Sequence, residues 1–286
     1  MASLQEEIAT GAASIKEGRA ALRAEVKELR AQLGFEQKRE KSAKICAELL
    51  ARIDQALAEE PSAAVSAGVA PAISAAAPAT PVEPAATPAA PATVSSATPS
   101  RSFKLGVYSA FSDEVDLDLL IQGAYERGVE VSFPCMMHDA HGIAGACEQT
   151  MEFRRISKGD YLASEEALGT GGSTRKTALA EGESGVPFLL HPLRRYHHDS
   201  PELASMPYVA ADELDMLVCP CVAFDTQGNR LGYGAGNYDR YLSQLLEPGT
   251  LNFVAGVQIV GVAFAEQQVP SIPVEEHDIP LPFVWA

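Results

Sequence analysis

The residues with the clearest capacity for chemistry form a glycine-rich stretch, GYGAGNY at residues 232–238, which we call the glycine loop. Glycine stands at every second position, and because glycine has no Cβ, backbone N–H groups can approach an anion closely there. Successive N–H groups of this kind form a concave nest that binds phosphate. Arg230 and Arg240 flank the loop, and a helix expected to begin near Asp239 would add the partial positive charge of its N-terminus. The stretch therefore predicts a phosphate site.

Asp239 adds the capacity to bind a metal ion, because Mg²⁺ prefers hard oxygen ligands such as a carboxylate. The common nucleotide signatures are absent, since the stretch has neither the Gly-Lys-Ser/Thr ending of a P-loop nor the G-x-G-x-x-G spacing of a dinucleotide fold. On the motif alone, a tight turn without a ligand is as compatible with these residues as a phosphate site.

Composition excludes several classes of function. The chain has 286 residues and a formal net charge of −16, which argues against a nucleic-acid partner because such surfaces are basic. No window reaches the ~18 consecutive apolar residues of a membrane helix. The N-terminus lacks the pattern of a secretory signal, and five cysteines do not suggest a disulfide framework. We expect a cytoplasmic protein with no membrane association.

Three regions of different composition position these residues. Residues 1–60 contain no proline and are rich in helix-forming residues, so we expect an N-terminal helical segment that packs on the main domain. Ser14 and Glu17 fit a capping box, which predicts a helix starting near Ile15, and a second helix is expected at 36–58. Residues 61–100 hold eight of the 19 prolines and only one charged residue, and predict a disordered spacer.

Residues 101–286 alternate strand-like and helix-like runs, which predicts an α/β domain with a mostly parallel sheet flanked by helices. The expected strands are apolar or β-branched runs at 104–110, 130–134, 151–156, 214–218 and 257–264. The expected helices lie at 117–127 and 239–246. A polar, glycine-containing stretch at 160–185 is expected to be a long, disordered loop.

The glycine loop and the residues before it, from 213 to 231, closely resemble the signature of 5-formyltetrahydrofolate cyclo-ligases, also called methenyltetrahydrofolate synthetases. Other segments match the family in the same order, among them RAALR at 19–23 and DEVD at 113–116. The remaining matches lie at 128–134, 151–155, 260–264 and 273–278. The resemblance covers the chain apart from the spacer, the polar loop and a short N-terminal extension.

The resemblance implies the fold shared with ribose-phosphate isomerases and CoA transferases. It also implies a monomeric enzyme of one-carbon metabolism that uses ATP and Mg²⁺. The implied reaction converts 5-formyltetrahydrofolate to 5,10-methenyltetrahydrofolate, by phosphorylation of the formyl oxygen and attack by N10. Phosphoryl transfer of this kind needs mainly positioning and charge neutralisation, which a cationic cradle and a metal can supply.

The same resemblance assigns roles to residues. Arg230 and Tyr238 are the implied catalytic residues, Ser109 and Glu114 would contact the folate, and Asp239 and Asp278 would bind magnesium. The implied ATP-binding residues are Arg19, Arg23, Arg230, Leu231, Gly232, Tyr233, Gly234, Ala235, Gly236, Asn237 and Tyr238. His277, beside Asp278, is either a partner of the metal carboxylate or an exposed loop residue.

Some positions depart from the family pattern and keep alternatives open. Ala235 replaces a usual glycine, Asn237 replaces a usual aromatic residue, and Arg19 stands where the family has lysine. A catalytically weakened relative that binds folate or nucleotide is therefore one alternative, and a ligase for another carboxamide-like substrate is a second. Charge patterning alone would make Arg19, Arg23 and Arg30 an ordinary solvated helix face.

Overall fold

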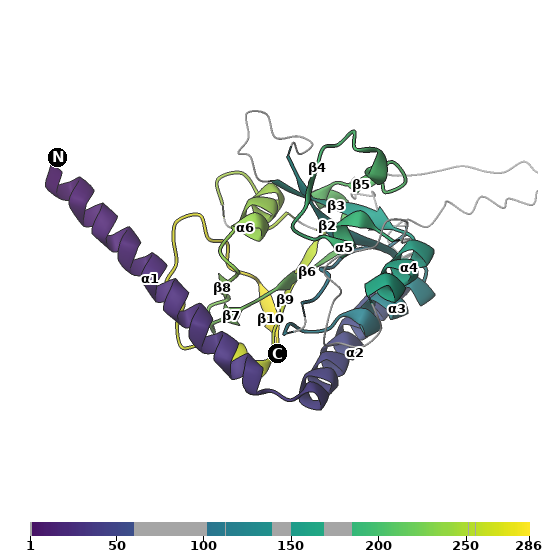
Figure 1. Cartoon of the computed structure of the whole chain (residues 1–286), viewed down its shortest axis with the longest axis horizontal. Helices are drawn as coiled ribbons and strands as arrows, with labels where there is room; N and C mark the ends of the chain where they lie inside the picture. Colours follow the sequence, from purple (N-terminus) through teal and green to yellow (C-terminus); the bar gives the residue numbers. More distant parts are fainter. Residues whose placement is uncertain are drawn as a thin grey trace, which may run out of the picture.

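The computed structural model describes residues 2–59, 102–111, 113–138, 150–168, 185–250, 252–254 and 256–286, with side chains from Ser14 onward (Figure 1). The predicted spacer at 61–100 lies outside the described residues, and so does the part of the predicted polar loop at 169–184.

A mostly parallel sheet forms the centre of the molecule (Figure 1). Its strand order is β10-β9-β6-β1-β2-β3-β5, and β4 also pairs with β2. Only β3 runs antiparallel to its neighbours, β2 and β5. A separate antiparallel pair, β7 and β8, precedes the glycine loop. The strands are β1 Lys104–Gly106, β2 Glu130–Met137, β3 Thr150–Ile156, β4 Arg195–Tyr196, β5 Tyr208–Val209, β6 Met216–Pro220, β7 Ala223–Phe224, β8 Arg230–Leu231, β9 Gln258–Val262 and β10 Phe283–Trp285.

Helices cover both faces of the sheet, which confirms the predicted fold class; the kinship with ribose-phosphate isomerases and CoA transferases stays a prediction. The α-helices are α1 Ala2–Gln32, α2 Phe35–Glu59, α3 Asp118–Glu126, α4 Lys158–Leu168, α5 Pro187–Leu190 and α6 Asn237–Leu242. Four short 3₁₀ helices are η1 Pro201–Leu203, η2 Ala211–Glu213, η3 Ser243–Leu245 and η4 Ala265–Gln267. Among the residues that the structure describes, no helix is both long enough and apolar enough to cross a membrane.

Two apolar clusters lie on opposite faces of the sheet, as the alternation of side chains along β6 shows. Met216 and Val218 join a cluster with α2 and α3, whereas Leu217 and Cys219 join a cluster with α6. Burial on both faces explains why the central strands read as continuous apolar runs in the sequence.

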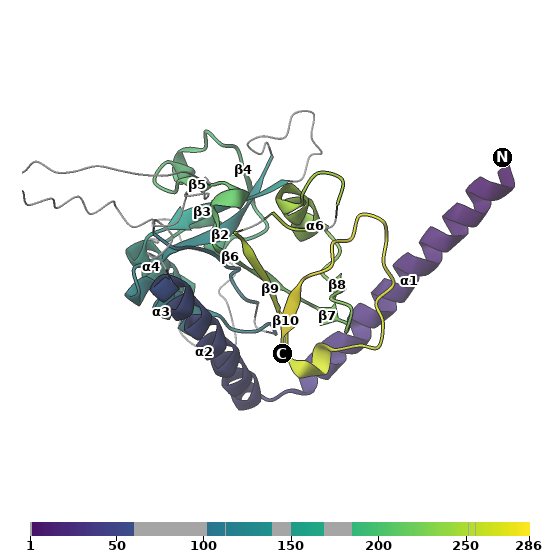
Figure 2. The ribbon, with the colours of Figure 1, turned by 180° about the vertical axis from the view of Figure 1, so that it is seen from behind.

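The two N-terminal helices lie in different places. Helix α2 packs on α3, and its bounds are close to the expected 36–58. Helix α1 begins at Ala2, well before the expected start near Ile15. Its C-terminal half lies along β7 and η4, while its N-terminal end extends beyond the body of the molecule (Figures 1 and 2).

The prediction of a loop from residue 160 is wrong for its first part, because α4 runs to Leu168. The hydroxyl of Ser157 accepts the backbone N–H of Asp160 and donates to the Asp160 side chain, which caps the helix start. Tyr161, Ser164 and Leu168 are buried on one side of the helix. The spacing of these three residues was the available signal in a stretch that otherwise looks polar.

Candidate active site

Most predicted site residues lie in the chain that follows the parallel strands β1, β6 and β9. Glu114 follows β1, the β7–β8 pair and the glycine loop follow β6, and Asp278 follows β9. The carboxyl ends of parallel strands meet at one edge of a sheet, which brings these segments together. Helix α1 lies along the same edge and contributes Arg19 and Arg23 (Figure 2).

The turn between β7 and β8 is fixed by the buried carboxylate of Asp225. This carboxylate accepts the backbone N–H groups of Gln227 at 2.9 Å, Asn229 at 3.0 Å and Ile272 at 3.1 Å. Gly228 in the same turn has a φ of 83°, and a Cβ there would clash with a backbone carbonyl oxygen of Leu281. The turn therefore requires glycine, and it places β8 directly before the glycine loop.

Two glycines of the glycine loop have left-handed backbones, with φ of 103° at Gly234 and 66° at Gly236. L-residues rarely adopt these values, so both positions favour glycine. Asn237, which replaces a family aromatic residue, lies at the start of α6. Its side-chain nitrogen is 3.8 Å from the sulfur of Met136, and its oxygen accepts Arg240 at 2.7 Å.

Arginines from two helices hold the carbonyl groups of the glycine loop. Arg23 of α1 donates its Nε to the Gly232 oxygen at 2.8 Å, and Arg240 of α6 donates to the Ala235 oxygen at 2.7 Å. The terminal nitrogens of Arg23 face Gly234, where a Cβ would lie 3.3 Å from Nη2. Arg23 can therefore hold the loop through Nε and offer its terminal nitrogens to an anion.

Arg230 is buried beside the predicted metal ligand Asp239. Its Nη2 donates to Asp239 Oδ1 at 2.8 Å, and its guanidinium lies 5.4 Å from the centre of the Tyr238 ring. Burial acts to lower the pKa of Arg230, but Asp239, together with the nearby Cys219 and Cys221, outweighs burial and raises the pKa. Burial also raises the pKa of Tyr238, whose hydroxyl has no hydrogen-bond partner among the described residues. The implied catalytic pair is thus a permanent cation and a protonated phenol.

Arg19 is the centre of an acidic group in the segment after β9. It donates to the Pro273 oxygen at 3.0 Å, to Glu275 at 2.6 Å and to the carboxylate of Asp278. Burial acts to raise the pKa of Asp278, but the hydrogen bonds from Arg19 and the Glu275 backbone, together with the Arg19 charge, outweigh burial and lower the pKa. The Asp239 carboxylate also acts on Arg19, which places both predicted metal ligands near one guanidinium.

The donor chemistry of these carboxylates fits Mg²⁺. Asp239 and Asp278 give one oxygen each to an arginine, and their side chains keep 20% and 14% exposure. Glu275, His277 and Asp278 offer ligand atoms within 4.8 Å of one another. The His277 side chain is 71% exposed and its Nε2 lies 3.6 Å from Glu275, so this histidine is an exposed loop residue that also contacts the acidic group.

Glu114 is buried and accepts the backbone N–H of Phe111 at 2.8 Å. Burial raises the pKa of Glu114, while the Phe111 N–H and the Tyr233 hydroxyl act in the opposite direction. Tyr233, which the resemblance places at ATP, therefore lies beside the implied folate contact. Ser109 is half-buried and follows the buried Tyr108 at the end of the β1 segment.

Sequence reasoning missed Arg30, which is fully buried and pairs with Asp113, the neighbour of Glu114. The signal was the spacing on α1. Arg30 follows Arg19 by 11 residues and Arg23 by seven, which are three turns and two turns of a helix. The three arginines therefore share one face of α1, and each reaches a different segment of the α/β domain.

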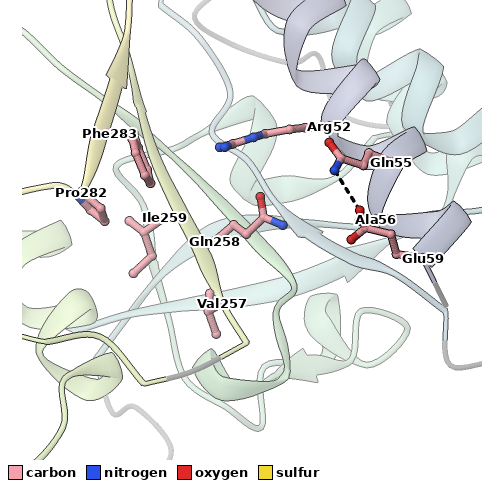
Figure 3. Close-up of a pocket in the computed structure, with 9 residues that line it drawn as sticks. All are labelled: Arg52, Gln55, Ala56, Glu59, Val257, Gln258, Ile259, Pro282 and Phe283. Carbon is pink, nitrogen blue, oxygen red and sulfur yellow. Dashed lines mark hydrogen bonds between the residues drawn. The ribbon is translucent and has the colours of Figure 1, made fainter. Parts of the chain in front are cut away.

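A pocket of about 320 Å³ lies away from these residues, at the amino ends of β9 and β10 (Figure 3). None of the residues that line it is a predicted site residue, and the guanidinium of Arg52 at its edge lies 5.5 Å from the Phe283 ring. Its lining residues are Arg52, Gln55, Ala56, Glu59, Val257, Gln258, Ile259, Pro282 and Phe283.

Comparisons with known proteins point to one family of enzymes. The model of a family described as the 5-formyltetrahydrofolate cyclo-ligase family matches residues 85–285. A 5-formyltetrahydrofolate cyclo-ligase of Escherichia coli (strain K12) is 41% identical over 92 residues, which are 32% of this chain and 47% of that protein. A similarly named protein of Haemophilus influenzae is 42% identical over 81 residues, or 28% of this chain and 40% of its own. The alignments thus span less than half of these two bacterial relatives.

Longer matches exist at lower identity. A probable 5-formyltetrahydrofolate cyclo-ligase of Caenorhabditis elegans is 28% identical over 180 residues, covering 63% of this chain and 70% of that protein. A solved structure of a 5,10-methenyltetrahydrofolate synthetase from Mycoplasma pneumoniae superposes with a TM-score of 0.51 at 14% identity. The superposition covers 93% of this chain and 96% of that one, and it shows a shared fold.

Proposed function

The chain belongs to the 5-formyltetrahydrofolate cyclo-ligase family, and on that premise we propose that it catalyses the ATP-dependent cyclisation of 5-formyltetrahydrofolate to 5,10-methenyltetrahydrofolate. The observation that carries the proposal is the cluster of Arg19, Arg23 and Arg230 around the glycine loop, next to Asp239 and Asp278. Such an arrangement suits a transferring phosphoryl group with a magnesium ion.

The chemistry has two steps. The γ-phosphoryl group passes to the formyl oxygen, so that the terminal P–O bond of ATP breaks, an O–P bond forms and ADP leaves. N10 then attacks the formyl carbon, the C–O bond breaks, phosphate leaves with the former formyl oxygen and the N10 proton is released. Phosphorylation turns a poor leaving group into a good one, so the protein needs no covalent nucleophile.

The cationic side chains act on the phosphates. The terminal nitrogens of Arg23 face the glycine loop and would bind phosphate oxygens, while the loop N–H groups and Arg19 would hold the rest of the triphosphate. Arg230 would neutralise charge that develops on the transferring group, because buried fixed donors act strongly where water is excluded. Tyr238 would donate its phenolic proton in a hydrogen bond to the formyl oxygen or to phosphate.

Asp239 and Asp278 would hold magnesium, which supplies charge neutralisation at the phosphates. Arg230 and Arg19 keep these two carboxylates ionised and oriented. On the folate side, the Glu114 carboxylate would accept ring N–H donors, and Ser109 would line the same pocket. We further propose that the protein acts as a monomer in the cytoplasm, where ATP is available.

The test measures methenyl product by its absorbance with purified protein. We expect turnover that needs 5-formyltetrahydrofolate, ATP and Mg²⁺ together and that falls by about 100-fold or more in Asp239→Asn, as for loss of one electrostatic contact at a reacting phosphoryl group. Asp54→Asn is the matched control, because Asp54 pairs with Arg127 on the surface far along the chain from the glycine loop. Equal activity of wild type and Asp239→Asn would contradict the proposed role of Asp239.

A weakened folate- or nucleotide-binding relative is the second candidate, because Ala235 and Asn237 change the glycine loop. The contacts of Arg240 with the Ala235 oxygen and the Asn237 side chain hold this altered loop in place, which favours an active enzyme. Binding of Mg-ATP and 5-formyltetrahydrofolate without product would support the second candidate. Product from another formyl or acyl amine alone would support a ligase of different substrate class.

A further inference from the structure

The buried guanidinium of Arg30 lies beside the candidate site but has no role in the proposed reaction. Arg30 has no exposed surface, and its Nη2 pairs with Asp113. Its Nε and Nη1 have no hydrogen-bond partner among the described residues. Burying a charged group whose N–H donors lack hydrogen bonds costs free energy of folding. Stability therefore does not explain an arginine at this position.

Tyr233 connects Arg30 with the glycine loop. Its ring packs edge-to-face on Phe111, with ring centres 6.0 Å apart, and Lys27 of α1 lies 5.5 Å above the ring. Burial raises the pKa of Tyr233, whereas the nearby Arg30 guanidinium lowers it. Tyr233 also lies next to Glu114, because its hydroxyl acts to lower the pKa of that carboxyl. One side chain of the glycine loop thus stands between Arg30 and Glu114.

Glu114 is held from both sides. The backbone N–H of Phe111 donates to its Oε2 at 2.8 Å, and Tyr233 faces it from the glycine loop. One anionic and one cationic side chain lie near Glu114: Asp113 opposes the ionisation of Glu114, and Arg30 favours it. Three neutral groups also face it: Tyr108, Cys221 and Tyr238.

We propose that Arg30 is a positioning residue that couples the acidic loop, residues 113–116, to the glycine loop, so that Glu114 is presented as an ionised acceptor to the folate while the phosphates are bound. The coupling has two arms. The ion pair with Asp113 fixes the acidic loop on α1. Phe111, whose N–H donates to Glu114, packs on the Tyr233 ring of the glycine loop, and in this proposal the Tyr233 hydroxyl donates to Glu114 as well.

The inference rests on the proposed function for the identity of the substrate, but its first test needs no ligand. Glutamate labelled with ¹³C at the carboxyl carbon reports the ionisation of Glu114 by NMR, and the Glu114→Gln variant assigns its signal. We expect the Glu114 pKa to rise in Arg30→Gln, because a nearby cation favours the charged form. Arg30→Lys should restore most of the change, and Arg39→Gln, which alters an exposed arginine of α2, should leave the titration unchanged.

The second test separates the two substrates. Calorimetry at pH 7 should show about tenfold weaker binding of 5-formyltetrahydrofolate in Arg30→Gln, with ATP affinity within twofold of wild type, as expected for a hydrogen bond to a charged group. Tyr233→Phe should weaken folate binding in the same way, and because it removes only the hydroxyl of an exposed side chain, we expect the variant to fold. In the background of Glu114→Gln, the Arg30→Gln change should have no further effect, since both act through one group.

The outcomes are distinguishable from a failure of the proposed function. Folate that does not bind to wild type contradicts the proposed substrate, whereas the NMR titration still decides the role of Arg30. An unchanged Glu114 titration in Arg30→Gln overturns the inference. If Arg30→Gln does not fold, Tyr233→Phe decides it, because equal folate affinity of Tyr233→Phe and wild type also overturns the coupling.

Discussion

Helices α1 and α2 have similar compositions and follow each other in the chain, yet they serve the molecule in different ways. Helix α2 buries Ile45, Leu49 and Ile53 in the core that it shares with α3. Helix α1 sends three arginines to segments of the candidate site. Among its side chains from Ser14 onward, Val26 is the buried apolar residue, and Leu22 and, just past the helix end, Leu33 are partly buried against apolar clusters. Helix α2 is held mainly by apolar burial, whereas α1 is held mainly by the contacts of its arginines.

The difference has a physical lesson. Apolar burial is non-directional and tolerates small shifts, whereas a guanidinium holds its acceptor at a fixed distance and angle. A helix attached by charge can therefore be part of a site that handles phosphates, because its cations can serve the protein and a ligand alternately. The predictions that follow test this contrast, from the largest expected effect to the smallest.

The largest effect on stability is expected in α2, the helix that packs in the core. Leu49→Ala in α2 should lower the free energy of unfolding by about 2–5 kcal/mol, because Leu49 is fully buried and the change leaves a cavity. The KM values for ATP and 5-formyltetrahydrofolate should stay within twofold of wild type. Urea unfolding and steady-state kinetics measure both, and a selective change of KM without loss of stability would contradict the contrast.

Loss of an α1 cation should give the reverse pattern. Arg19→Met should reduce kcat/KM for ATP by about 100-fold, or ~2.7 kcal/mol, while the free energy of unfolding changes by less than about 1 kcal/mol. The reason is that Arg19 pairs with partly exposed carboxylates rather than with the core. Steady-state kinetics and urea unfolding of wild type and Arg19→Met measure the two quantities. Global unfolding of Arg19→Met would contradict the prediction, because it would show that α1 is part of the core.

Acid should affect the α1 contacts first. The folded-state pKa of Asp278 lies below its ordinary value of 3.8, so the stabilisation by Arg19 is fully present above that value and is lost as the pH falls through the folded-state pKa. The difference in unfolding free energy between wild type and Arg19→Met should therefore be constant from pH 7 to 5 and shrink below about pH 4. A difference that grows on acidification would contradict this sign.

The smallest effect is expected at an exposed pair of α2. Arg39 and Glu36 lie 3.7 Å apart with both side chains largely exposed, so Arg39→Gln should change stability by less than about 0.5 kcal/mol. Turnover should stay unchanged as well. A thermal melt and the absorbance assay measure these, and a loss of turnover would mean that any arginine of the N-terminal helices matters, which removes the distinction between α1 and α2.

The sequence predicted where α2 and the longer strands lie better than it predicted which face of a helix points inward. The proline-free, helix-forming composition of residues 1–60 gave α2 within one residue at each end, and five of the strands lie where apolar runs indicated. The two-residue strands β4, β5, β7 and β8 were missed because two residues carry no alternation. Edge strand β10 was missed because its three residues follow a proline-rich segment and β9 supplies its only pairing in the described sheet.

The site could be predicted in part. The alternating glycines pointed to the glycine loop without any comparison, and the family resemblance supplied Arg19, Glu114 and Asp278. The inward face of α1 was not predicted, because charge spacing on a helix is the same for a solvated stripe and for a stripe that binds acidic groups. Only the positions of Asp113 and Asp278 in space separate the two interpretations.

The most direct measurement of the central claim, that α1 brings cations to the phosphates, is the ATP affinity of three proteins side by side. Calorimetry with Mg-ATP should give about 10- to 100-fold weaker binding in Arg23→Met, whose terminal nitrogens face the glycine loop, and wild-type binding in Arg39→Met. Equal ATP affinity of wild type and Arg23→Met, in a protein that binds ATP, would contradict the account.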